Sequence, residues 1–246
     1  MYRFFVEPSQ IQDTKIIIMG RDVNHIKNVL RMKIGEEIVI CNGIDNREYC
    51  CRIEEYTDHE VICALRSIQE DDVELPAKIY LFQGLPKSDK MELVIQKAIE
   101  LGAYAVIPVA AKRCVVKLDE KKAEAKVNRW QGIAEAAAKQ SKRGVIPTVH
   151  NVMSMREAIE YARDMDIKLI PYELAEDMQR TKTAIEAVKA GESVAVFIGP
   201  EGGFEESEVQ AALKAGIEPI TLGKRILRTE TAGLTVLSWL MYQLES

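Results

Sequence analysis

Short apolar runs separated by polar turns dominate the first 70 residues. Three of these runs, at 37–40, 49–56 and 60–68, have the length of β-strands, and Asn42-Gly43 after the first run is a strong turn signal. Short strands at this spacing predict a small β-barrel. Apolar residues at helical spacing also predict one helix before them, over 22–32.

The pattern changes after a polar stretch that ends at Pro76, where strand-like and helix-like runs begin to alternate. This alternation predicts an α/β domain with a mostly parallel sheet covered by helices on both faces. We therefore expect two domains, 1–72 and 73–246. The predicted strands are 78–83, 105–109, 167–171, 194–198 and 218–222, and the predicted helices are 88–101, 123–141, 154–165, 181–190, 205–215 and 231–244.

Composition narrows the class of protein. The chain has 246 residues, of which 47% are hydrophobic and 29% charged, as in ordinary globular proteins. No apolar run approaches the roughly 18 residues of a membrane span, and the start does not resemble a signal peptide, so we expect a cytoplasmic protein. Five cysteines without a CxxC pair, and only three histidines, argue against a disulfide framework and against a metal site.

Charge is unevenly distributed. The formal net charge is −5, yet the stretch 112–143 carries 10 basic and 4 acidic side chains. Basic islands in an acidic protein suit a surface that contacts a few phosphates. On charge alone, a solvated helix face explains this island as well.

The segment 194–204, VAVFIGPEGGF, is the most distinctive motif. A buried strand ends in a glycine-rich turn that carries a carboxylate, Glu201, and then opens a helix. Glycines permit a close approach of backbone to a ligand. Because the turn has neither the GK[ST] nor the GxGxxG pattern, it does not predict a pyrophosphate site.

A second motif lies one strand later, at 220–233, ITLGKRILRTETAG. A strand again ends in glycine, and basic and hydroxyl side chains lead into the last helix. Lysine and arginine at such a position hold phosphate or polarise a carbonyl. Tyr172-Glu173, at another predicted strand end, is a weaker signal. Ligands of parallel sheets bind beyond the carboxyl ends of the strands.

Together, these two motifs resemble the RsmE family of 16S ribosomal RNA uridine N3-methyltransferases, in the SPOUT superfamily. The resemblance extends over nearly the whole chain, in order, through Arg3-Phe4-Phe5, His25 with Val29-Leu30-Arg31 and Gly35, 87–92, 97–102, and Glu135 with Gln140-Ser141 and Arg143. It implies a PUA-like barrel followed by a SPOUT domain with a C-terminal trefoil knot. It also implies S-adenosylmethionine as cofactor, a homodimer, and methylation of N3 of a uridine in the decoding region of 16S rRNA in the small ribosomal subunit.

The resemblance also implies a set of site residues. Three loops would surround the cofactor: Pro171, Tyr172 and Glu173; Ile198, Gly199, Pro200, Glu201, Gly202 and Gly203; and Leu222, Gly223, Ile226, Leu227 and Arg228. We expect Leu222, Ile226 and Leu227 to sandwich the adenine. The expected RNA contacts are Arg3, Arg21, Lys27, Arg31, Gln140, Ser141 and Arg143.

The chemistry leaves the general base open. Glu201 and Glu230 are the carboxylates nearest the predicted site, and Arg228 suits stabilisation of negative charge on the uracil oxygens. We expect Arg228, Glu230 and Glu201 as the catalytic candidates, while loss of the proton to water remains an alternative.

Two other functions stay open at this point. One is a SPOUT methyltransferase with another target, a ribose 2′-hydroxyl or a transfer RNA. The other is a ribosome-binding factor without turnover. The last helix, 231–244, is apolar on all sides, which independently favours burial against a second subunit, although burial within its own domain gives the same pattern.

Overall fold

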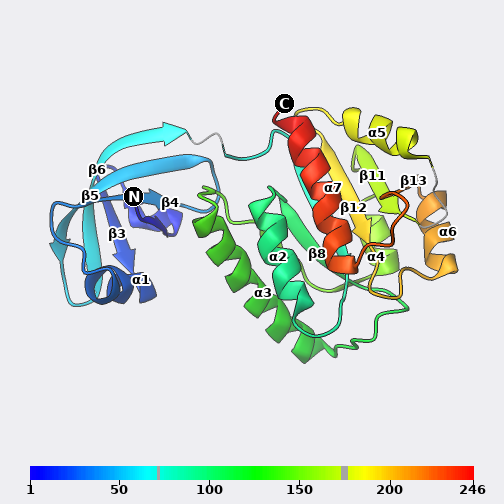
Figure 1. Ribbon diagram of the computed structural model, residues 1–246. Helices are drawn as coiled ribbons and strands as arrows, with labels where there is room; N and C mark the ends of the chain where they lie inside the picture. The colour runs from blue at the N-terminus through cyan, green and yellow to red at the C-terminus, as the bar shows by residue number, and fades with distance from the viewer. Residues whose placement is uncertain (71–72, 173–176) are drawn as a thin grey trace. The chain divides into compact units, whose positions relative to one another are not determined.

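Figure 1 shows the computed structural model of the chain. It describes residues 1–70, 73–172 and 177–246. Their contacts divide the chain into two compact units, Met1–Glu74 with Ala138–Ile146, and Leu75–Ala137 with Pro147–Ser246. The predicted division at Asp72 lies outside the described residues and stays a prediction. Nothing in the sequence analysis assigned 138–146 to the first unit.

The first unit contains a six-stranded sheet in the order β1-β4-β5-β6-β3-β2. Its neighbouring strands are antiparallel except β1 and β4, which are parallel. The three predicted strands are confirmed, and three further strands precede them. Helical structure also lies where it is predicted, but it consists of a short α-helix and a π-helix and ends at Val29, not at Met32. In chain order the elements are β1 (Arg3–Phe5), the 3-10 helix η1 (Pro8–Gln10), β2 (Ile11–Gln12), β3 (Lys15–Met19), α1 (Arg21–Asn24), the π-helix η2 (His25–Val29), β4 (Glu37–Cys41), β5 (Arg47–Tyr56) and β6 (Glu60–Glu70).

Alternate side chains of these strands form the core of the first unit. Ile16 and Ile18 of β3, Ile38 and Ile40 of β4, and Ile53 of β5 are at most 1% exposed. Side chains two residues apart point to the same face of a strand, so each strand contributes one apolar row. The helical segment closes this core.

The second unit contains a parallel sheet in the order β10-β8-β7-β12-β11-β13, with β9 beside β8. Each strand pair recorded in it is parallel, which confirms the prediction. In chain order the elements are β7 (Lys78–Gly84), α2 (Lys90–Glu100), β8 (Ala105–Ala110), α3 (Glu120–Gln140), β9 (Thr148–Val149), β10 (Met153–Ser154), α4 (Met155–Tyr161), β11 (Ile167–Pro171), α5 (Met178–Glu186), β12 (Ser193–Ile198), α6 (Glu206–Lys214), β13 (Glu218–Ile220) and α7 (Thr229–Leu244). The last three residues of α3 belong to the first unit.

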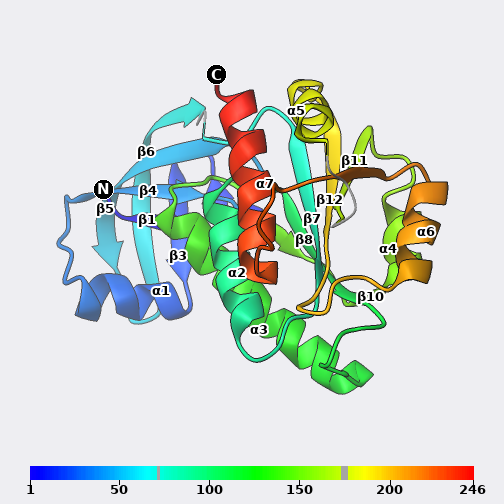
Figure 2. The same cartoon turned by 45° about the vertical axis from the view of Figure 1, so that its right-hand side comes forward.

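Helices cover both faces of this sheet, as predicted. On one face α2 and α7 lie side by side (Figures 1 and 2), and Leu81 and Gln83 of β7 point toward Gly233 of α7. On the other face the ring of Phe82 meets Tyr161 of α4, with centroids 6.1 Å apart. This alternation places a polar side chain, that of Gln83, inside the apolar layer under α7.

Each helix predicted for this unit has at least one end displaced by one to four residues. α4 begins after Ser154 because the Ser154 hydroxyl accepts a hydrogen bond from Glu157 N while the Glu157 carboxylate accepts one from Ser154 N, a capping box. α5 begins at Met178, three residues before its predicted start. The Asp177 side chain caps it by accepting hydrogen bonds from Gln179 N and Arg180 N.

Candidate active site

Three predicted loops begin at neighbouring strand ends. β11 pairs with β12 on one side and with β13 on the other, all in parallel, so the loops after them leave the same edge of the sheet. These loops contain Pro171–Tyr172, Gly199–Gly203 and Leu222–Arg228. Glu173 lies outside the described residues. The structure therefore gathers most of the predicted cofactor residues along one edge.

The segment Gly199–Gly203, called the glycine turn below, is tightly closed. Gly203 N donates to Pro200 O at 2.8 Å, and Gly203 has a φ of +66°. A Cβ at Gly199 would lie 3.0 Å from the Cα of Gly203. A Cβ at Gly84, at the end of β7, would lie 2.7 Å from Pro200. Only glycine permits this approach of β7 to the turn.

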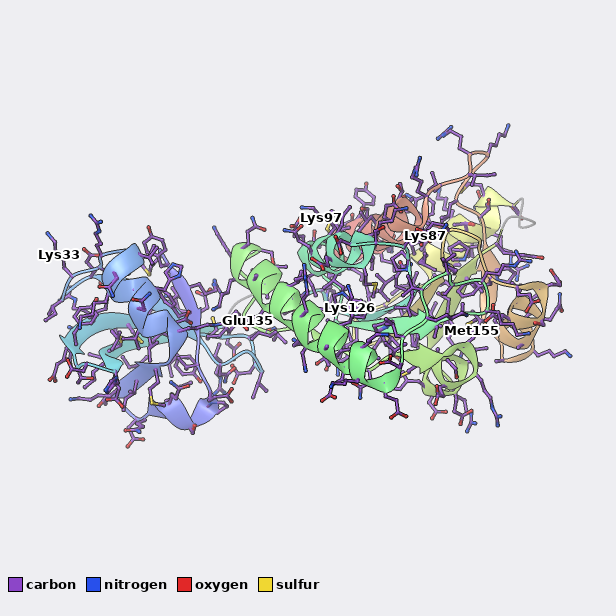
Figure 3. The ribbon with its side chains drawn as sticks, turned by 90° about the horizontal axis from the view of Figure 1, so that it is seen from below. Lys33, Lys87, Lys97, Lys126, Glu135 and Met155 are labelled. Carbon is purple, nitrogen blue, oxygen red and sulfur yellow. The ribbon has the colours of Figure 1, made fainter. Side chains whose placement is uncertain are left out.

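Two basic segments clamp the glycine turn, and sequence reasoning did not assign either of them to the site. Lys87 N, in the segment before α2, donates to Glu201 Oε1 at 3.1 Å, and Nζ of Lys90, the first residue of α2, donates to the same oxygen at 3.1 Å. From the loop after β8, Arg113 Nη1 donates to Gly202 O at 3.1 Å. The Lys87 side chain is exposed (Figure 3). Lys87 and Lys90 belong to the stretch 87–92 of the resemblance, whereas Arg113 belongs only to the basic stretch 112–143, which did not point to the glycine turn.

The Glu201 carboxylate is held in its ionised form. Partial burial would raise its pKa, but hydrogen bonds from the backbone N–H groups of Glu201 and Lys87, together with the Lys90 ammonium, lower the pKa overall. A carboxylate whose charge is stabilised in this way is a weak proton acceptor. Its contacts instead suit a clamp that fixes the glycine turn.

The Glu230 carboxylate has a different environment. Its Oε2 atom is buried and 3.4 Å from Lys90 Nζ, yet it accepts no hydrogen bond from the described residues. The side chain as a whole is 18% exposed. Since both Glu201 and Glu230 approach the same ammonium, the first turn of α7 lies beside the glycine turn. Arg228, the N-cap of α7, is exposed.

The loop 222–228 is anchored at its start and open at its tip. Thr221 N donates to Thr181 Oγ1 at 2.9 Å, and the Thr181 hydroxyl donates to Thr221 O at 3.2 Å. Leu222 and Leu227 are half-buried, but Ile226 is 88% exposed. The expected contact of these side chains with adenine stays a prediction.

The tyrosine at the third strand end is held by two hydrogen bonds. Tyr172 N donates to Ile220 O at 3.0 Å, and its hydroxyl donates to Glu206 Oε2 at 2.9 Å. Pro171 and Tyr172 are half-buried. This loop therefore lies against the end of β13 and the start of α6.

The candidate RNA contacts of the first unit differ in exposure. Arg21, Lys27 and Arg31 are exposed, and Lys27 Nζ lies 5.9 Å from the centroid of the Tyr56 ring. The Arg3 side chain is only 11% exposed and is paired with Glu48. The Arg3 guanidinium is therefore mostly buried in an ion pair with Glu48 of the same unit.

The three remaining RNA candidates follow α3 or end it. Gln140 is exposed, and the Ser141 hydroxyl donates to Ala138 O at 3.4 Å. The Arg143 side chain is 2% exposed, and its Nε donates to Glu74 Oε1 at 2.8 Å, with a second bond from Nη2 to Oε2. The Arg143 side chain is thus buried against Glu74 within the first unit, and its predicted RNA contact stays a prediction.

The thiols are buried apolar side chains, as expected for reduced cysteines. None of the five forms a disulfide, and each except the half-buried Cys50 is buried. Burial raises the pKa of Cys51 and Cys63 to about 12. Among the described residues, no cluster of three His, Cys, Asp or Glu side chains is arranged to hold a metal, and no helix is long and apolar enough to cross a membrane.

Comparison with known proteins defines the class first. Two family models match the chain, an RNA methyltransferase domain over residues 73–241 and an RNA methyltransferase PUA domain over residues 18–66. The parallel sheet with its glycine turn lies in the first match, and most of the antiparallel strands lie in the second. The protein is thus an RNA methyltransferase with a PUA domain.

Individual relatives narrow the class to one family. Ribosomal RNA small subunit methyltransferase E of Bacillus subtilis (strain 168) is 39% identical and covers 100% of this chain and 98% of its own. The same enzyme of Neisseria gonorrhoeae, solved with S-adenosylmethionine, is 32% identical, with a TM-score of 0.84 over 97% of this chain and 96% of its own. A Legionella pneumophila methyltransferase, also solved with the cofactor, is 33% identical, with a TM-score of 0.85 over 98% and 96%. The chain belongs to the ribosomal RNA small subunit methyltransferase E family, as the resemblance predicted.

Proposed function

We propose that the protein transfers the methyl group of S-adenosylmethionine to N3 of a uridine in the decoding region of 16S rRNA, within the small ribosomal subunit. The loops at the sheet edge fit this cofactor. They offer backbone amides and carbonyls of glycines, which suit adenine and ribose, and carboxylates, which suit a cationic sulfonium. The observation that carries the proposal is the buried Glu230 Oε2, which accepts no hydrogen bond from the described residues although Lys90 Nζ lies 3.4 Å away.

The reaction requires alignment and removal of one proton. When bound, S-adenosylmethionine supplies a methyl carbon activated by the positive sulfur. A bond forms between uridine N3 and this carbon, the carbon–sulfur bond breaks with its electron pair moving to sulfur, and the N3 proton leaves. Holding the two reactants in line lowers the barrier by several kcal/mol, on the order of 7–11 in the best-oriented cases.

Glu230 is the better proton acceptor of the two candidate carboxylates. Its Oε2 atom accepts no hydrogen bond from the described residues, so we assign the imide proton of uridine to it, and the Lys90 ammonium lies 3.4 Å from the same atom. Glu201 already accepts bonds from Lys87 N and Lys90 Nζ. We therefore assign proton transfer to Glu230 and the fixing of the glycine turn to Glu201.

RNA contacts complete this proposal. Arg228 lies one turn of helix or less from Glu230, at the N-cap of α7, where its guanidinium suits the oxygens on either side of N3. N3 of a paired uridine is hidden, so the base has to leave its stack before reaction. Arg21, Lys27 and Arg31 supply exposed cations for the RNA backbone.

The assembly and topology also follow the family pattern in this proposal. α7 buries Val236, Leu237 and Leu240 but leaves Trp239 half-buried and Tyr242 75% exposed, an apolar face that a second copy would cover in a homodimer. The loops after β11, β12 and β13 would form the trefoil knot of the SPOUT domain. The domain division falls between residues 72 and 73, and the protein acts in the cytoplasm, where its ribosomal substrate is assembled.

Methyl transfer to defined acceptors tests the function. Purified protein is incubated with S-adenosylmethionine labelled in the methyl group and with small subunits from cells that lack the enzyme, naked 16S rRNA or bulk transfer RNA. Mass spectrometry of the nucleosides should find labelled 3-methyluridine from the small subunit. Label on a ribose or in transfer RNA would refute the target, and cofactor binding without transfer to any acceptor would favour the non-catalytic factor.

A matched pair of variants tests the assignment of the two carboxylates. Glu230→Gln keeps the size of the side chain but accepts no proton, so kcat should fall by roughly 10²–10⁴ with unchanged cofactor affinity. Glu201→Gln should instead weaken cofactor binding, and it should lower kcat less than Glu230→Gln does. The reverse pattern would assign proton transfer to Glu201, and normal kcat in both variants would assign it to water.

A further inference from the structure

Gln83 is a polar side chain sealed inside the second unit. It is 0% exposed and lies at the end of β7, under α7, between the apolar side chains Leu81 and Ile198 that approach Gly233. Its Nε2 donates to Gly84 O at 3.0 Å and to Thr229 Oγ1 at 2.8 Å. A reversed amide would set its oxygen against the Gly84 carbonyl, so these bonds fix its orientation.

Thr229 connects Gln83 to the glycine turn through a second hydrogen bond. Its side chain begins α7 and is buried, and its hydroxyl oxygen accepts the hydrogen bond of Gln83. The hydroxyl proton therefore points away from Gln83, to Gly199 O at 2.6 Å. A directed chain of two hydrogen bonds thus joins the end of β7, the start of α7 and the first carbonyl of the glycine turn.

The amide oxygen of Gln83 shows that this chain is not optimised for stability. Gln83 Oε1 is buried and has no hydrogen-bond partner in the described part of the chain. Leaving a buried acceptor unpaired is destabilising, whereas an apolar side chain of the same shape carries no such cost. The amide orientation that satisfies Thr229 is kept even though it leaves the other end of the amide unpaired.

From this geometry we propose that Gln83 and Thr229 are positioning residues that orient the Gly199 carbonyl, and with it the glycine turn, for cofactor binding. The inference rests on the proposed function, since it assigns the turn to S-adenosylmethionine. Neither side chain touches the reacting atoms. Both act through the peptide group at Gly199. Rotation of this peptide group would displace the start of the glycine turn. The turn has no space to absorb the displacement, because Gly84 and Gly203 are in close contact with it.

Substitutions at Thr229 separate the hydroxyl from the volume of the side chain. Thr229→Val keeps the shape and removes the hydrogen bond to Gly199 O, whereas Thr229→Ser keeps the hydrogen bond and removes a methyl group. Isothermal titration calorimetry with S-adenosylmethionine should find binding at least about tenfold weaker in Thr229→Val and within about twofold of wild type in Thr229→Ser. KM for the RNA acceptor should not change in either variant.

Gln83→Met provides an independent variant, should Thr229→Val fold poorly. It should also weaken cofactor binding, and the double variant with Thr229→Val should be no weaker than Thr229→Val alone, because both changes remove the same directed bond. Thermal unfolding of each variant checks that the fold is retained.

Several outcomes would overturn the inference: wild-type affinity in Thr229→Val, equal losses in Thr229→Val and Thr229→Ser, or additive losses in the double variant. Failure of the proposed function is distinguishable from all of these, because then the wild-type protein itself would not bind S-adenosylmethionine.

Discussion

The ion pair of Arg143 with Glu74 gives the sharpest test of how the first unit is held together. Arg143 follows α3, and its guanidinium makes two hydrogen bonds to the Glu74 carboxylate. We predict that Arg143→Met, which keeps most of the side-chain length, destabilises the first unit and does not act on RNA binding directly. This prediction opposes the sequence-based assignment of Arg143 to RNA.

The structure sets the size of the effect. Removing one partner of a fully buried ion pair costs about 3–5 kcal/mol, because the other charge stays buried without compensation. The Arg143 side chain is 2% exposed, but that of Glu74 is 16% exposed, so water reaches the abandoned carboxylate. We therefore expect a loss near the lower end, about 3 kcal/mol. Replacing both residues with methionine should recover most of this loss, since no buried charge remains.

Urea unfolding followed by circular dichroism measures the loss, and hydrogen exchange of β4 and β5 localises it to the first unit. RNA binding is measured at a temperature where the variant is still folded. A change below about 1 kcal/mol, accompanied by a large loss of RNA affinity, would refute the structural role and return Arg143 to the RNA surface. A double variant as unstable as Arg143→Met would refute the role of the buried charge.

Four further predictions follow from close contacts and burial. Gly84→Ala places a Cβ 2.7 Å from the proline of the glycine turn and should weaken S-adenosylmethionine binding at least about tenfold in calorimetry, whereas Gly132→Ala on α3, with nothing within 4 Å, should not. Phe82→Ala removes a fully buried ring stacked at 4.3 Å on its neighbour in β12 and should lower the unfolding free energy by about 3–5 kcal/mol in urea. Because burial raises the pKa of Cys51 to about 12, mass spectrometry should find iodoacetamide on Cys50 but not on Cys51 at pH 8. The same raised pKa stabilises the fold below pH 9, and unfolding should become easier as the pH rises from 9 toward 12, because only the unfolded chain then ionises this thiol.

Local sequence patterns predicted the sheet of the second unit well. A five-residue apolar run such as 194–198 is typical of a strand buried on both faces, and the alternation of such runs with helices requires parallel pairing. The same patterns missed β3, although Gly20 follows it, because its short unbroken run IIIM has no alternation and does not distinguish a strand from a buried helical segment. The observed start of α5 differs from the predicted start because its N-cap, Asp177, lies outside the apolar pattern from which the helix was predicted.

The candidate site was predicted in part, for a physical reason. Residues of the glycine turn lie together in the chain and carry a recognisable composition. Lys90 and Arg113 act on that turn from 111 and 89 residues away, so no local pattern relates them to it. Burial is equally invisible in a sequence. Arg143 carries the charge that an RNA contact needs, and only the fold decides that this charge faces Glu74 instead.

The buried polar side chains of the second unit explain why its loops are placed so specifically. Glu208 accepts hydrogen bonds from Lys112 N and Glu205 N, Thr181 holds the backbone of Thr221, and Gln83 with Thr229 holds Gly199. Apolar packing is non-directional and fixes the sheet and its covering helices, but it does not orient a single carbonyl or amide. Directed hydrogen bonds do, at the risk of an unpaired group such as Gln83 Oε1. Their concentration at the carboxyl edge of the sheet is what a site that recognises a ligand through backbone atoms requires.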